Sequence, residues 1–430
     1  MKCRSYFLPF ILLFMGCVSN QSFESRILSE VELRPSIDDF LEDWRSKGSY
    51  QPDVLRNLMV TTLHRGLTVP SSQLNVQAIK TVERYEVESL ANQVMLLVDH
   101  PSDVVSATAA VAVIKSHPPA PHVAKKLTRS SDPNARRIVA EGLGRKIGII
   151  ASADLIRLAD DKAPKVQKAA LNALAKTKSN EFRALYLRKL NSNDSGVVQS
   201  AIKGLSSSPL PQDIEKIKLA YTHPHLGVRL EALRLLNKVW NKSRNALEYL
   251  AKTNRKDKRI ALEASKILYH KTGIKNPSLA IELLSSHEIP LRNLALRHAS
   301  FHLPRQKWQS LLLNELKSND PAQRWLAANL LTKSKDDSHI NTVAQDILQN
   351  GPNALKIEIA GVLAQRGNNE ALNFLSNELT KNDPKDFVQL LSASRQAGKP
   401  TIGLVELLRA TSTKTRLDAA EVLLSFHSLP

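Results

Sequence analysis

The chain has 430 residues, 42% hydrophobic and 23% charged, and is long enough to bury a large core. Glycine is scarce, at 15 residues, and aromatic side chains make up 5%, which favours helices over an all-β fold. The formal charge of +19 favours anionic partners such as acidic proteins, lipid headgroups, anionic polymers or nucleic acid. Solvated helix surfaces without any ligand would carry such a charge equally well.

Residues 1–16 are predicted to be an export signal. A basic start and an apolar run over residues 6–15, too short to span a bilayer, precede Gly16 and Cys17. The chain has two cysteines, and the other one, Cys3, lies within this signal. A mature chain that begins at Cys17 would therefore contain no second thiol and no disulfide.

Gly16 followed by Cys17 resembles the lipobox of bacterial lipoproteins, in which the cysteine is lipidated and becomes the new N-terminus. Phe14 and Met15 are bulkier than that family usually places there, so an ordinary cleaved signal with a chance cysteine, or an uncleaved anchor, is the alternative. The resemblance implies a lipid anchor at Cys17, and Val18 after it implies sorting to the outer membrane. Without lipidation, the protein is expected to be periplasmic.

The mature N-terminus is predicted to consist of a tether and a short helical cap. Residues 17–35 are largely polar and are expected to lead away from the membrane. Residues 36–70 contain two predicted helices, over 36–45 and 52–66, with an apolar seam. Both helices fit poorly the repeat that follows, as an atypical N-terminal cap of a repeat array would.

From residue 71 to residue 430, a turn followed by an amphipathic helix recurs about every 31 residues. In one copy, Asp132 can cap the helix and Pro133 suits its first turn. One such helix cannot bury its apolar stripe alone, so an array is predicted. The stripes begin at Leu74, Val104, Ala135, Val166, Val197, Val228, Ile260, Leu291, Gln323, Leu355, Phe387 and Thr415. A small residue follows four positions later at Ala78, Val139, Ala170, Ala201, Ala232, Ala264, Ala295, Ala327 and Ala419.

The repeated segments resemble HEAT repeats, in particular the short bacterial HEAT-like repeats also found in phycobilisome lyase subunits. The segments that carry the resemblance are DPNARRIVAEGLG, APKVQKAALNALA, SGVVQSAIKGL, LGVRLEALRLL, EIPLRNLALRHA and DPAQRWLAANLL. The resemblance implies an all-α solenoid of about 11–12 helical hairpins. It also implies that turn aspartates and helix arginines, such as Asp132 and Arg136, link neighbouring repeats.

The side of each helix opposite the apolar stripe is expected to line the concave surface of the solenoid, as it does in HEAT-like arrays. On this side, four consecutive repeats carry a cation six residues after the first residue of the apolar stripe: Lys203, Arg234, Lys266 and Arg297. This row predicts a basic groove for an acidic protein or an anionic envelope polymer, although a solvated surface without a ligand is the alternative. Further cations lie nearby at Arg137, Lys168, Lys176 and Lys238.

Three apolar residues stand two positions past a start, where the pattern predicts exposure: Leu230, Leu262 and Trp325. Trp325 beside a basic groove is expected to anchor a partner, because tryptophan and arginine dominate interface hot spots. The competing interpretation is a one-residue shift of register that places all three in the core.

No combination of residues predicts catalysis, a cofactor or a metal. His298 and His302 are four residues apart, as metal ligands on a helix can be, but no third ligand stands nearby and His298 falls on the inward stripe. We therefore expect a non-enzymatic envelope scaffold that binds a partner protein. The alternative is an intracellular nucleic-acid-binding protein similar to HEAT-like alkylpurine DNA glycosylases, which the export signal disfavours.

Overall fold

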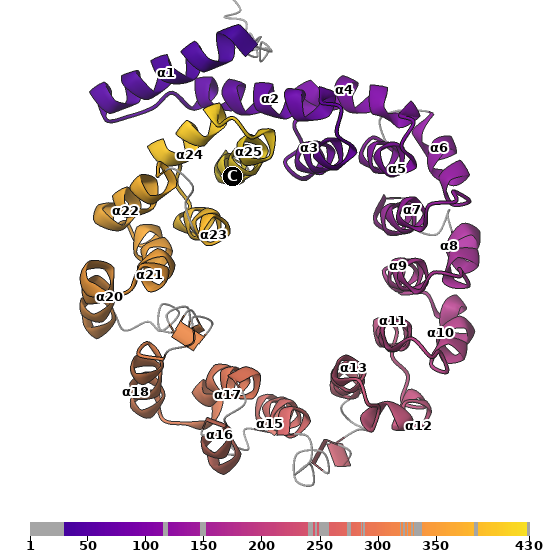
Figure 1. The fold of residues 1–430 in the computed structure, drawn as a ribbon. Coiled ribbons are helices and arrows are strands. Elements are labelled where there is room, and N and C mark those ends of the chain that lie inside the picture. Colours follow the sequence, from indigo (N-terminus) through magenta and orange to yellow (C-terminus); the bar gives the residue numbers. More distant parts are fainter. Residues whose placement is uncertain are drawn as a thin grey trace, which may run out of the picture.

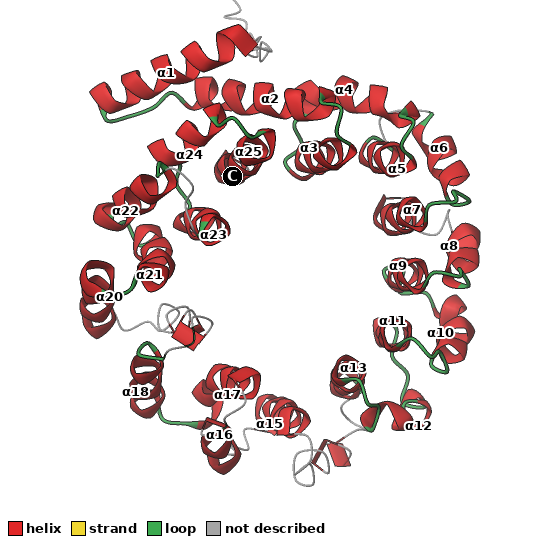
Figure 2. Ribbon diagram, in the orientation of Figure 1, coloured by secondary structure: helices red, strands yellow, loops and turns green. Residues whose placement is uncertain are grey.

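The computed structural model describes residues 30–114, 119–146, 152–239, 244–245, 247–248, 258–272, 277–284, 286, 289–318, 320, 323–324, 326–327, 330, 338–381 and 386–427. Within these ranges the chain forms helices joined by short turns and contains no strand (Figure 2). The expected all-α solenoid is therefore confirmed. None of the helices in these ranges is long and apolar enough to cross a bilayer.

The helices form two concentric layers that follow a ring (Figure 1). The inner helices are α3 (Ser72–Arg84), α5 (Asp103–Ala112), α7 (Pro133–Lys146), α9 (Pro164–Ala175), α11 (Ser195–Ser207), α13 (Leu226–Lys238), α15 (Lys258–Thr272), α17 (Ile289–His302), α21 (Asn353–Gln365), α23 (Phe387–Ala397) and α25 (Thr413–His427).

The outer helices are α1 (Glu30–Lys47), α2 (Pro52–Thr68), α4 (Ala91–Leu96), α6 (Ala120–Leu127), α8 (Ser152–Ala159), α10 (Arg183–Lys189), α12 (Asp213–Lys216), α16 (Pro277–Leu284), α18 (Arg305–Glu315), α20 (Ser338–Asn350), α22 (Asn369–Leu379) and α24 (Ile402–Glu406). Short 3-10 helices extend the layers at η1 (Glu88–Leu90), η2 (Leu97–Asp99), η4 (Asn180–Phe182), η5 (Lys218–Tyr221) and η6 (Leu407–Arg409).

The repeated small side chain forms the centre of the contact between neighbouring inner helices. In every copy that carries it, the small side chain four residues past the start is completely buried, from Ala78 in α3 to Ala419 in α25. Most starting positions, including Val166 and Val228, are buried as well. In α25, however, the buried residue is Leu417, two positions beyond the expected Thr415. Ala419 and Leu423, four and eight residues past Thr415, are nevertheless completely buried, so the predicted register is confirmed in α25 as it is in most of the array.

A cation one residue past the start ties each of several inner helices to the turn before it. Its side chain donates hydrogen bonds to backbone carbonyl oxygens of the turn before the inner helix or, for Lys356, of the last turn of α20. The pairs are Arg136 with Ser130 (2.7 Å), Arg229 with Pro224 (2.8 Å), Arg324 with Ser318 (2.9 Å) and Lys356 with Gln349 (2.7 Å). These cations therefore stabilise each hairpin internally.

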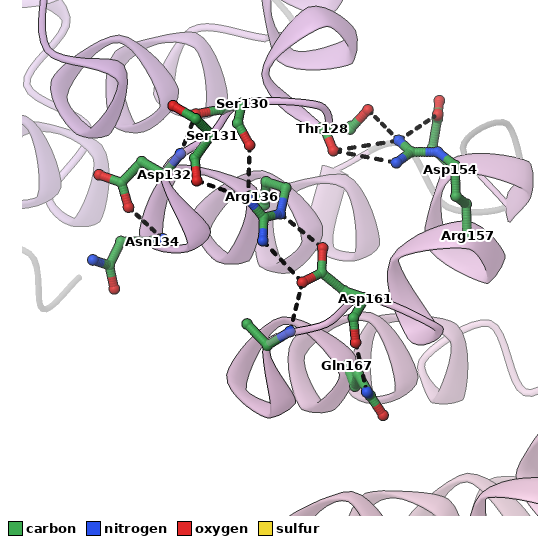
Figure 3. Close-up of polar contacts among 11 residues, drawn as sticks. Thr128, Ser130, Ser131, Asp132, Asn134, Arg136, Asp154, Arg157, Asp161 and Gln167 are labelled. Atoms are coloured by element: carbon green, nitrogen blue, oxygen red, sulfur yellow. Dashed lines mark hydrogen bonds and ion pairs between the residues drawn. The ribbon is translucent and has the colours of Figure 1, made fainter.

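Arg136 also links two repeats (Figure 3). Its Nε and Nη2 donate to Asp161 Oδ2 and Oδ1 at 2.7 and 2.9 Å, so the pair is bidentate. Asp161 lies in the turn before α9, one repeat further on. Asp132, by contrast, accepts a hydrogen bond from the N–H of Asn134 at 2.7 Å and so caps its own helix α7. The expected link between repeats is correct for Arg136 and wrong for Asp132.

The two ends of the array pack against each other and close the ring within one chain. The last inner helix, α25, packs against α2 and α3, and α24 with η6 packs against α1 (Figure 1). Leu417 of α25 is 1% exposed and lies against Gly66 of α2. A Cβ at Gly66 would lie 2.6 Å from Leu417 Cδ2, so the buried side chain of Leu417 would have to shift to make room for it. The absence of a side chain at Gly66 therefore permits this close approach.

Polar side chains surround the apolar contact between the two ends. Gln77 Nε2 donates to Asp418 Oδ1 at 2.7 Å, and Arg84 Nη1 donates to Glu421 Oε1 at 2.5 Å. In the outer layer, ion pairs join Arg45 to Glu406 and Arg409 to Asp38. The segment expected to cap the array, residues 36–70, therefore lies between its first and its last repeat.

Candidate functional site

The four cations predicted to form a row lie on four consecutive inner helices, α11, α13, α15 and α17. Outer helices cover one side of each inner helix and neighbouring inner helices cover its flanks, so an exposed residue opposite the core stripe faces the centre of the ring (Figure 1). Lys203, Arg234 and Arg297 are exposed, and Lys266 is half-buried. We call the surface that all the inner helices together present to the centre of the ring the inner surface.

The four cations differ in how far their charge is already compensated. Arg234 Nη1 lies 2.7 Å from Oε2 of the buried Glu231, one turn earlier. The ammonium group of Lys266 lies 5.9 Å from the centre of the Phe301 ring, within the range of a cation–π contact. For Lys203 and Arg297, no described residue provides an ion pair. Two uncompensated cations therefore stand at the ends of the row.

A groove of about 560 Å³ runs along the inner surface over α3, α5, α7 and α9. Small and apolar side chains form its floor: Thr108, Val111, Ile138, Ala169 and Ala173. Charged and polar side chains form its rim: Lys80, Glu83, Arg84, Glu141, Asn172 and Lys176. The groove ends at α9, and the predicted row begins on the next inner helix, α11.

Sequence reasoning named Arg137, Lys168 and Lys176 in this part of the array only as cations near the predicted row, because Glu141 and Asn172 interrupt the cations at the position six past the start. The available signal was Lys80, which occupies that position in α3, together with Lys176, the C-cap residue of α9. Glu141 is compensated by Arg137, whose Nη1 lies 2.8 Å from its carboxylate. Across the described chain, neither Lys80 nor Lys176 makes an ion pair.

The interface role expected for the residues two past the start is wrong for Leu262. Leu262 is completely buried, because this side of α15 packs against Leu283 of α16 and Ala295 of α17. Leu230 is half-buried against a core cluster. The third residue, Trp325, lies outside the described residues, so its role as an anchor stays a prediction.

His298 and His302 are buried in α17 among aromatic side chains from α15 and α17. Burial lowers the pKa of His298 to about 3, with the charge of Lys266 acting in the same direction, so its imidazole is neutral at pH 7. Its Nε2 lies 3.4 Å from Glu263 Oε1. In the portions of the chain described here, no three histidine, cysteine or acidic residues are grouped as a metal site would need.

Glu358 on α21 is an acidic residue that sequence reasoning did not single out. Glu358 lies three residues after Leu355, where the apolar stripe of α21 begins. The residues at the same position in α7 and α9 line the groove. Burial raises the pKa of its carboxyl to about 7, although the charge of Arg324 lowers it. Near neutral pH, Glu358 therefore carries only part of a negative charge.

Comparison with known proteins agrees with this architecture over part of the chain. A family profile described as HEAT repeats matches residues 120–206, which run from α6 to α11. Among curated proteins, none matches the sequence.

Several solved structures resemble the chain. An engineered protein is 18% identical, with 86% of this chain and 99% of that chain covered and a TM-score of 0.31. The complex of CpcE and CpcF of phycocyanin lyase from Nostoc sp. is 17% identical, with 64% and 93% covered and a TM-score of 0.28. A homology model of the full-length AP-3 complex in an intermediate open conformation is 11% identical, with 82% and 93% covered and a TM-score of 0.36.

Proposed function

We propose that this protein is a non-enzymatic scaffold of the bacterial cell envelope that binds an acidic partner on the inner surface of its helical ring. The partner is an acidic protein or an anionic envelope polymer. The observation that carries the proposal is the exposure of uncompensated cations, Lys203 and Arg297, on inner helices whose other sides are packed. A side chain held there loses no packing on binding, and its charge is available to a carboxylate or phosphate.

The inner surface is a binding surface of many weak contacts under this proposal. A rigid array of helices presents its charges without reorganisation, so little conformational entropy is lost when a partner binds. Charged pairs of this kind contribute mainly to the association rate and to specificity, and they weaken with salt. Binding by the inner surface should therefore be fast and salt-dependent.

Nucleic acid is the less favoured partner. Acidic side chains, including Glu83, Glu141 and Glu263, alternate with the cations on the inner helices. A duplex carries a phosphate charge at every step and would meet these carboxylates repeatedly. The export signal predicted for residues 1–16 points in the same direction.

The first test reverses the two uncompensated charges. In the variant Lys203→Glu with Arg297→Glu, the affinity for fluorescent poly-L-glutamate is expected to fall about tenfold at low salt, and its salt dependence to weaken. Fluorescence anisotropy at several salt concentrations measures both. The matched control is Lys126→Glu with Lys307→Glu, two exposed cations on the outer helices α6 and α18. An equal loss of affinity in both variants would mean that only the net charge of the protein matters. Unchanged affinity in both variants would contradict the proposal.

Lipidation at Cys17 is tested separately, because Cys17 lies outside the described residues. Labelled fatty acid should be incorporated into the full chain expressed in bacteria but not into its Cys17→Ser variant, which should be recovered in the soluble periplasmic fraction. Unlabelled wild-type chain in the cytosol would favour the intracellular alternative.

A further inference from the structure

We propose that the ring encircles its partner, an extended acidic polypeptide, so that the contact between α25 and α2–α3 acts as a clasp. This inference rests on the proposed function and adds to it the topology of the complex and the chemical class of the partner. It is carried by the closure of the ring, the distribution of charge along the inner surface and the lining of the groove.

The clasp is a specific contact between the two ends of the chain. Leu417 is buried against Gly66, which has no side chain, and the hydrogen bond from Gln77 to Asp418 fixes how α25 lies against α3. Apolar burial, a close approach of two helices and paired polar groups occur together there, as they do between neighbouring repeats within the array. The ends of the solenoid therefore bind each other as successive repeats do.

Charge on the inner surface is balanced at the clasp and unbalanced away from it. Glu421 pairs with Arg84 at 2.5 Å and with Arg395 at 3.4 Å, and Lys414 pairs with Asp418 at 2.6 Å. Away from the clasp, three exposed cations have no ion-pair partner among the described residues: Lys176, Lys203 and Arg297. An acidic partner can thus contact the inner surface from α9 to α17 without competing with the clasp.

The groove over α3, α5, α7 and α9 favours a polypeptide over a uniformly charged polymer. Its floor includes the apolar side chains Val111 and Ile138, and its rim carries cations together with the carboxylate of Glu141. A chain with a charge on every unit would leave the apolar floor of the groove unfilled. An extended polypeptide can direct apolar side chains to the floor and carboxylates to Lys80 and Lys176.

The ring is wide enough for an extended chain but not for a large folded domain. About twelve inner helices at a spacing of roughly 10 Å place the helix axes on a circle roughly 40 Å across, and side chains narrow the opening further. A partner inside the ring can leave only by sliding out end first or by opening of the clasp.

The experiment holds the clasp shut with a removable cross-link. The variant carries Gln77→Cys and Asp418→Cys in the full chain, with Cys3→Ser and Cys17→Ser so that no other thiol remains. A bismaleimide with a disulfide in its spacer joins the two thiols, and a reductant releases them. Two probes share one disordered acidic polypeptide of about 60 residues. One probe has a folded domain of about 300 residues, roughly 50 Å across, at one end, and the other has such a domain at both ends.

Encirclement predicts that the cross-linked ring binds the probe with one folded end as tightly as the free ring does. It should bind the probe with two folded ends at least tenfold more weakly, and reduction should restore that binding if the clasp opens in solution. If the free ring binds the probe with one folded end but not the probe with two, the partner can enter the ring only by its unfolded end. This result also supports encirclement.

The control places the same cross-link between the neighbouring helices α11 and α13, with Gln199→Cys and Gly227→Cys, because a Cβ at Gly227 would lie 3.1 Å from Gln199 Oε1 and this pair does not bridge the clasp. Tight binding of both probes to the ring with the shut clasp would overturn encirclement and leave the proposed function intact. Failure of the free ring to bind either probe would overturn both.

Discussion

Asp161 illustrates how one carboxylate serves two adjacent repeats. It accepts both hydrogen bonds of the Arg136 guanidinium and a third from the N–H of Ala163 at 2.8 Å. Burial raises the pKa of the Asp161 carboxyl, but these hydrogen bonds outweigh burial and hold its pKa below the ordinary value. The same pair raises the pKa of Arg136. The ionised pair is therefore the stable form of this contact at neutral pH.

The variant Asp161→Asn is expected to lower the free energy of unfolding by about 2 kcal/mol at pH 7, because the side chain of Arg136 is only 16% exposed and would lose a charged partner. In the unfolded chain this carboxyl is protonated first as the pH falls, so the contribution of the pair is complete above about pH 4 and is lost below it. Urea unfolding followed by circular dichroism at pH 7, 4 and 3 measures this. A difference from the wild type that does not shrink in acid would contradict the assignment.

The cations of the candidate site were predictable at the scale of single residues because their positions follow from the helical period. A row six residues past each start must lie opposite the stripe, and three of the four side chains are exposed in the structure. The groove was not predictable in this way. Its floor is formed by small side chains of four different helices, and only their packing decides that these lie together.

At the scale of the helix, close approach between neighbours depends on small side chains at repeated positions. Gly144 in α7 is an example, since a Cβ there would lie 2.6 Å from the Cα of Ala173 in α9. Backbone cannot move aside as a flexible side chain can, so this position admits no larger residue without separating the two helices. The register predicted from the sequence follows from the same requirement.

Replacing Gly144 by alanine is therefore expected to destabilise the array by about 1–3 kcal/mol, even though alanine favours helices by about 1 kcal/mol. Gly196→Ala in α11 is the matched control. A Cβ at Gly196 would meet only the end of the Lys168 side chain, which can move away, so this variant should be neutral or slightly stabilising. Midpoints of urea unfolding compare the two, and equal midpoints would mean that the helices α7 and α9 are not held at close range.

At the scale of the whole molecule, closure turns a repeat array into a ring. An open solenoid needs terminal caps with polar outer surfaces, because its end repeats have no neighbour on one side. Here each end covers the other, with Leu417 of the last repeat buried against the segment that precedes the first. The clasp therefore takes the place of two caps, and cross-linking Gln77→Cys to Asp418→Cys tests its consequence for binding.

The sequence by itself determined the helical repeat, its register and the side of each helix that carries charge. These properties depend on spacings of three and four residues and on a period of about 31, which are local and can be read directly. It did not determine the curvature of the array. A small rotation from each repeat to the next accumulates along the chain, and side-chain packing between helices sets that rotation. Only the tertiary structure could decide that the rotations sum to a closed turn, bring α25 to α2 and direct the charged surface toward the centre of a ring.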